Sequence, residues 1–96
     1  KIEYFASAIK NYALGGKHTT IEDILIRARE LSISRESILK ELKPHIPEIE
    51  ARAEELSERE KYKEAADIYE TLTEVVEGKN KKISYSVLAI KNYALV

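Results

Sequence analysis

The chain has 96 residues, and its 16 Lys and Arg nearly balance its 17 Asp and Glu. This balance excludes a global field that would attract nucleic acid or an anionic membrane, and the absence of cysteine excludes disulfides, thiolate zinc sites and a cysteine nucleophile. No apolar run approaches the roughly 18 residues of a membrane span. We therefore expect a soluble, cytoplasmic domain, and the absence of Cys, Met and Trp is typical of thermophilic proteins.

The first half of the chain predicts three helices. The first ends at Gly15-Gly16, because glycine readily adopts the left-handed conformation that follows many helices. Thr19 and Glu22 have the spacing of a capping box and begin the second helix. Ser34 caps a short third helix, which stops near Pro44. Helical spacing predicts a buried stripe on the first helix, made of Ile2, Phe5, Ile9 and Tyr12, with Ala8 and Ala13 between them.

The second half predicts the remaining helices. Pro47 suits the first turn of a fourth helix, since its missing N–H needs no partner there. A weak break precedes a fifth helix, which begins at Tyr62 and is closed by Gly78, and the basic stretch 79–82 leads into a last helix at 84–95. No strand pattern persists, so the sequence predicts an all-α fold of five or six short antiparallel helices. The residues expected to be buried in the fourth and fifth helices are Ile49, Ala53, Leu56, Ala65, Ala66, Tyr69, Leu72 and Val76.

The two ends of the chain are near copies of each other. KIEYFASAIKNYAL at 1–14 aligns with KISYSVLAIKNYAL at 82–95, with ten identical pairs out of fourteen. The differing pairs are Glu3/Ser84, Phe5/Ser86, Ala6/Val87 and Ser7/Leu88. We interpret residues 1–96 as one helical domain cut from a longer repeat protein, with an engineered duplication as the alternative. The shared residues predict almost the same buried stripe in both copies.

The segment 53–78 resembles a helical hairpin of the tetratricopeptide repeat. It carries Y-x-x-A-x-x-x-Y as Tyr62, Ala65 and Tyr69, a spacing that lets two helices approach closely beside aromatic rings. The usual turn glycine is Glu60 here. The MIT domain, a three-helix adaptor, shares the same signature. The resemblance implies a right-handed stack of helices that binds proteins and has no catalytic activity of its own.

The same resemblance places the binding surface on the first helices of successive hairpins. The exposed residues that it implies for protein binding are Lys10, Asn11 and Tyr12, with their copies Lys91, Asn92 and Tyr93. An alternative is that both tyrosines are core rings and both lysines are solvated. The expected partner is a protein or peptide. A second molecule of this chain is a further expected partner, because its last helix could compete with the first for one groove.

A second pattern, ARELSISRESILKEL at 28–42, resembles the helix-turn-helix of bacterial and archaeal regulators. Ala28 takes the place of the small residue between the helices, and Ser32 stands where a turn glycine is usual. The resemblance implies DNA binding as an alternative function. Against it, Glu36 and Glu41 would face phosphates. The residues that would contact nucleic acid are Arg35, Ser37, Lys40 and Lys43.

Catalytic and metal-binding patterns are missing from the sequence. His18 and His45 have neither the spacing of a metal pair nor a Ser or Asp arranged as a catalytic partner. The sequence also lacks a glycine-rich phosphate loop. We therefore expect no enzyme activity, no cofactor and no metal.

Overall fold

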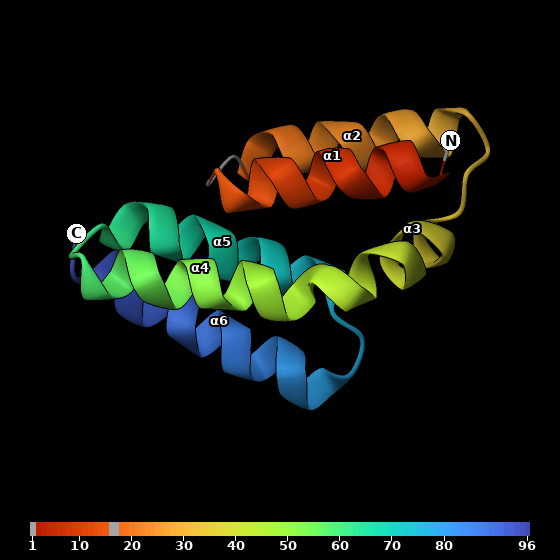
Figure 1. Ribbon diagram of the computed structural model, residues 1–96. Coiled ribbons are helices and arrows are strands. Elements are labelled where there is room, and N and C mark those ends of the chain that lie inside the picture. Colours follow the sequence, from red (N-terminus) through yellow and green to blue (C-terminus); the bar gives the residue numbers. More distant parts are fainter. Residues whose placement is uncertain (1, 16–17) are drawn as a thin grey trace.

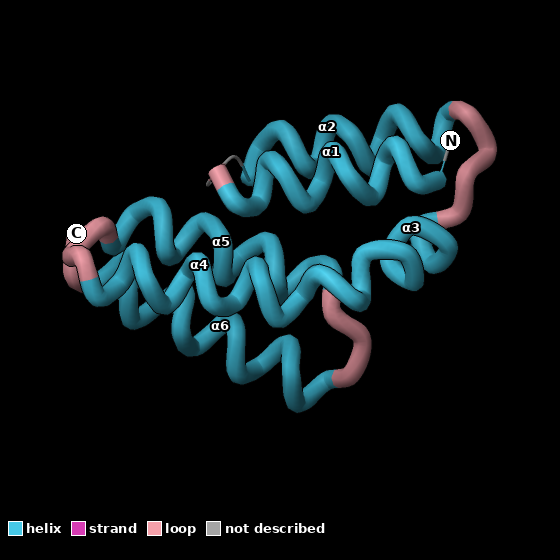
Figure 2. Tube along the Cα trace, viewed as in Figure 1, coloured by secondary structure: helices cyan, strands magenta, loops and turns pink. Residues whose placement is uncertain are grey.

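The computed structural model describes residues 2–15 and 18–96, with the side chains of 18–22 excepted. Over this part of the chain it contains six α-helices, one 3₁₀ turn and no strand (Figure 2). The all-α prediction is confirmed. The elements are α1 (Ile2–Leu14), α2 (His18–Glu30), α3 (Arg35–Leu42), η1 (Lys43–His45), α4 (Ile46–Glu58), α5 (Tyr62–Val75) and α6 (Lys79–Ala94).

The helices are arranged in layers, with the α4–α5 hairpin in the middle (Figure 1). The α1–α2 hairpin lies on one side of this pair, where α1 contacts α3, α4 and α5 and α2 contacts α5. On the opposite side α6 packs along α5. The α3 helix runs through η1 into α4 and so joins the first hairpin to the middle layer.

The core follows the apolar stripes of the sequence. Every residue predicted to be buried in the fourth and fifth helices is buried. In the first helix the prediction holds for Phe5, Ile9 and Ala13 and is wrong for Ile2 and Tyr12, which are 36% and 41% exposed. Ala8 is only partly buried, and Ala6 is buried instead. The largest fully buried side chains are Ile9, Ile38, Leu42, Ile49, Ile68, Thr71, Leu72 and Val75.

Two helices end in the same kind of turn. At the end of α4 the Lys61 N–H donates to the Leu56 carbonyl at 2.8 Å, and the Glu60 N–H donates to the Ser57 carbonyl at 3.1 Å. This pair of bonds is the Schellman motif, whose fifth residue takes a left-handed conformation. Glu60 accordingly has φ 63°, and Ser32 has φ 61° in the equivalent turn after α2. Both residues stand where the resembled families place glycine.

Replacing Glu60 by glycine is therefore expected to raise the free energy of unfolding by about 1 kcal/mol, because the left-handed conformation is costly for a residue with a Cβ. Urea unfolding followed by circular dichroism measures this change. Ala51→Gly is the control, since Ala51 is exposed in the interior of α4 and glycine there should lower the free energy of unfolding by about 1 kcal/mol. A loss of stability in both variants would contradict the expectation.

The observed starts of the helices match the sequence predictions only in part. Ser34 caps α3 as predicted, since its Oγ accepts a hydrogen bond from the Ser37 N–H at 3.2 Å. The predicted capping box of Thr19 and Glu22 lies outside the described side chains. The prediction that 79–82 forms a connection is wrong, because α6 already begins at Lys79. Its first turn is anchored by Lys82, whose Nζ donates to the Thr73 carbonyl near the end of α5 at 2.9 Å.

Candidate protein-binding surface

The repeated helix buries different faces in its two copies. In α1 the side chain of Ile9 is fully buried, whereas its copy Ile90 in α6 is 66% exposed. The reverse holds for Tyr4, which is 72% exposed, and its copy Tyr85, which is 7% exposed. The prediction of one shared buried stripe is therefore wrong.

The geometry of a helix explains this difference. At about 100° per residue, positions 2, 6, 9 and 13 lie on one side of α1, and positions 4, 8 and 11 lie on nearly the opposite side. The first side of α1 carries Ala6, Ile9 and Ala13, which are buried where α1 meets α2 and α3. The second side is buried in α6, which packs on α5. The sequence therefore encodes a helix with two apolar faces, and each copy covers one of them.

The residues that differ between the copies fit these two environments. Phe5 is buried in α1, whereas its counterpart Ser86 is only partly buried. Ser7 is exposed in α1, whereas its counterpart Leu88 packs against the core from α6. The two copies are therefore adapted to their own positions.

The uncovered face of α6 forms an apolar stripe, which we call the α6 seam: Ile83, Val87, Ile90 and Ala94. The spacing of four, three and four residues is that of the a and d positions of a heptad, the pattern of a helix that packs along another helix. Ile83 and Val87 are 52% and 49% exposed. Sequence reasoning missed this surface, although the repeat carried the signal, since Val87, Ile90 and Ala94 occupy the positions of three residues that α1 buries.

In the first copy, the predicted binding residues lie at the edge of the α1 contact surface. The Lys10 Nζ is 3.3 Å from the Glu48 carboxylate on α4. Asn11 is exposed, and Tyr12 is 41% exposed. Lys10 is thus engaged within the fold, and the two other side chains face outward.

In the second copy, the predicted residues are split between the surface and the α5 contact. Lys91 is exposed. Asn92 is 5% exposed, and its Nδ2 donates to the Leu88 carbonyl at 2.8 Å. Tyr93 is partly exposed, and its hydroxyl donates to the Asp67 carboxylate on α5. By heptad position Lys91 and Tyr93 flank the α6 seam, whereas Asn92 faces away from it.

Tyrosines and carboxylates join α4, α5 and α6. The Tyr85 hydroxyl donates to the Glu50 carboxylate on α4, and the Tyr85 ring stacks on Tyr69 with the centroids 6.3 Å apart. Burial and the hydrogen bond to Glu50 raise the pKa of Tyr85. Burial and the negative charges of Glu54 and Glu50 raise the pKa of Tyr69. Burial and the hydrogen bond to Asp67 likewise raise the pKa of Tyr93.

A groove of about 740 Å³ lies where α3, η1 and α4 meet the α5–α6 connection. Its lining residues are Glu36, Leu39, Lys40, Lys43, Ile46, Pro47, Val75, Val76, Glu77 and Lys81. Of the residues predicted to bind DNA, the groove brings Lys40 and Lys43 together. Arg35 instead donates to the Glu74 carbonyl at 2.6 Å, and the Ser37 hydroxyl hydrogen-bonds that of Ser34 at 2.7 Å.

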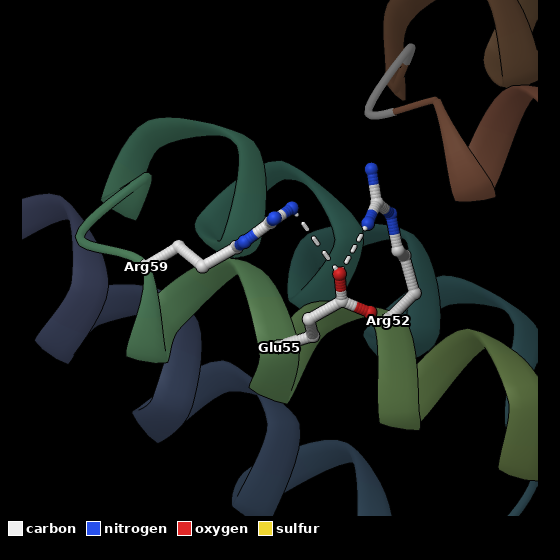
Figure 3. A network of polar contacts seen from close by, with 3 residues as sticks. All are labelled: Arg52, Glu55 and Arg59. Carbon is white, nitrogen blue, oxygen red and sulfur yellow. Dashed lines mark hydrogen bonds and ion pairs between the residues drawn. The ribbon is translucent and has the colours of Figure 1, made fainter.

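The outer face of α4 carries a network of exposed charges (Figure 3). Arg52 and Arg59 both contact the Oε1 atom of Glu55, at 3.0 and 3.4 Å. Exposed ion pairs of this kind contribute at most about 1 kcal/mol each. This face is a solvated helix surface.

Within the described part of the chain, no helix combines the length and the apolar character needed to cross a membrane. The same residues contain no group of three His, Cys, Asp or Glu side chains placed to hold a metal ion. Comparison with family models, curated proteins and solved structures finds no match. The interpretation therefore rests on the residues of this chain.

Proposed function

We propose that this chain is a non-catalytic protein–protein interaction module of tetratricopeptide-like type, and that the α6 seam is its docking surface. One observation carries the proposal. The positions of Ala6 and Ile9, which α1 buries, recur in α6 as Val87 and Ile90, and these two residues are exposed together with Ile83. Because a heptad-spaced stripe is suited to a helical neighbour, the partner segment is a helix.

The burial energy available at the α6 seam is not sufficient by itself to hold a partner. Full burial of an aliphatic side chain contributes roughly 1.5–3 kcal/mol, and about half of that remains to be gained for Ile83, Val87 and Ile90. The sum is roughly 3 kcal/mol, which is less than association usually costs in lost freedom of motion. Contacts at the border of the seam must therefore contribute as well, and Lys91 and Tyr93 are placed to make them.

The residues that differ between the two copies do not favour self-association by exchange of the terminal helices. In an exchanged dimer, Ser86 would replace buried Phe5 and Val87 would replace buried Ala6. The first change loses an aromatic contact worth roughly 3–5 kcal/mol, and the second overpacks the site. These differences favour the intramolecular copy.

The test is a selection of helical peptides from a random display library against the full chain. Binding of the selected peptides is then compared with the variant Ile83→Gln/Val87→Gln/Ile90→Gln, which keeps good helix formers but removes the apolar stripe. We expect at least tenfold weaker binding to this variant. Circular dichroism checks that its helix content is unchanged.

The matched control is Ile26→Gln/Leu31→Gln, because these aliphatic residues are exposed to a similar extent outside α6. It should bind the selected peptides as the parent does. Peptides that bind the parent and the seam variant equally well would place the docking surface elsewhere. A selection without binders would remove the support for an interaction module.

A further inference from the structure

We propose that the partner of the α6 seam is an acidic amphipathic helix, with apolar residues that pack on the seam and a carboxylate that faces Lys91. This inference rests on the proposed function and specifies the chemistry of its ligand. Three features of the chain support it: the charge of α6, the environment of the same helix in its first copy, and the narrow width of the seam.

The charge of this chain is unevenly distributed. Residues 79–96 contain four lysines and no Asp or Glu, whereas the other 78 residues contain the remaining 12 Lys and Arg and all 17 Asp and Glu. Lys79, Lys81 and Lys91 are exposed. A chain with a net charge of only −1 thus presents a cationic docking helix. A partner of opposite charge would be attracted to this helix and preferred over other partners.

The first copy shows how this helix packs when its outer face is covered. In α1 the equivalent stripe packs on helices of the same chain, and Lys10, the counterpart of Lys91, lies 3.3 Å from the Glu48 carboxylate. Glu48 is on α4, a helix that α1 contacts. A partner helix with a glutamate at the corresponding place would reproduce this pair at Lys91.

The width and the charge of the seam argue against two other occupants. An anionic membrane surface is bound by helices with a broad apolar face, whereas Ser84 and Ser86 lie beside the seam in the heptad. A second α6 packed on the seam would bring lysines of both copies together with no carboxylate on either helix, which is unfavourable.

Two synthetic helical peptides test the proposal. Both carry the same leucine and isoleucine heptad stripe, and the flanking positions are glutamate in one and lysine in the other. Fluorescence anisotropy with the full chain is expected to show at least tenfold tighter binding of the glutamate peptide at low salt. The preference should shrink at high salt, because exposed charges are screened.

Charge-reversal variants locate the effect. Lys91→Glu should reduce binding of the glutamate peptide by at least fivefold. Lys40→Glu changes the net charge by the same amount at an exposed position outside the seam, in the groove where α3, η1 and α4 meet the α5–α6 connection. This variant should leave binding nearly unchanged. Equal losses in both variants would show that only net charge matters and would overturn the proposal.

The remaining outcomes separate this proposal from the function on which it rests. Equal binding of both peptides, lost in the seam variant, would overturn the acidic partner and retain the docking surface. Seam-dependent binding to vesicles of phosphatidylcholine and phosphatidylserine without peptide binding would assign the seam to a membrane. A seam-dependent rise in mass by light scattering without peptide binding would assign it to a second copy.

Discussion

Replacing Leu72 by alanine is expected to lower the free energy of unfolding by roughly 2–5 kcal/mol. Leu72 is fully buried on α5, the helix that contacts α2, α4 and α6. Removing its side-chain atoms leaves a cavity that these helices cannot close without moving together. Urea unfolding followed by circular dichroism measures the change. A domain of this size typically has only about 5–15 kcal/mol of stability in total, so the variant should be partly unfolded at moderate urea.

Leu95→Ala is the matched control for this substitution. Leu95 follows α6 and is 60% exposed, so the same atoms are removed without a cavity. The control is expected to change the stability by less than about 0.5 kcal/mol. Similar losses for the two variants would contradict the packing of α5 at the centre of the layers.

Raising the pH above about 10 is expected to destabilise the fold through Tyr85. The pKa of this tyrosine is raised in the folded chain from its ordinary value of 10.0, first by burial and then by its hydrogen bond to Glu50. The folded state therefore keeps a proton that the unfolded state releases. The stability that Tyr85 contributes is fully present below pH 10 and falls as the pH rises from there towards the folded pKa.

The expected slope is up to about 1.4 kcal/mol per pH unit for one such group. Urea unfolding at several pH values between 9 and about 11.5 measures it. Tyr85→Phe should reduce the slope without abolishing it, since the pKa values of Tyr69 and Tyr93 are raised as well. The substitution should also lower the stability at neutral pH, because the Glu50 carboxylate loses a donor. Tyr4→Phe removes a hydroxyl from a 72% exposed ring and is the control. An unchanged slope in the Tyr85 variant would contradict the role of Tyr85 in the pH dependence of stability.

The sequence predicts those parts of the fold that depend on local spacing. Ala65, Tyr69 and Leu72 occur at intervals that place them on one side of a helix, and all are buried in α5. Ser34 is a strong capping residue directly before a helical stripe, and it caps α3. These features need no knowledge of neighbouring helices, so periodicity and capping chemistry are sufficient.

Features that depend on neighbouring helices are not predictable in this way. A helix with two apolar faces does not reveal which face its neighbours cover, so Ile9 and Ile90 have the same local sequence and opposite environments. The start of α6 at Lys79 follows Gly78, which has φ 96°, and is accompanied by a contact of Lys82 with α5 that the local pattern does not reveal. The α6 seam was missed for the same reason, because its exposure follows from the packing of α6 on α5.

The order of the layers also determines which helices open locally before the whole chain unfolds. The α4, α5 and α6 helices are consecutive, and most of their contacts join helices that are neighbours in sequence, so these contacts close short loops. The α1–α2 hairpin instead depends on contacts with α3, α4 and α5 that join more distant residues. Short loops close at a lower entropic cost and favour early folding. The amide protons of α5 should therefore exchange most slowly, while local opening of the first hairpin leaves α4, α5 and α6 folded.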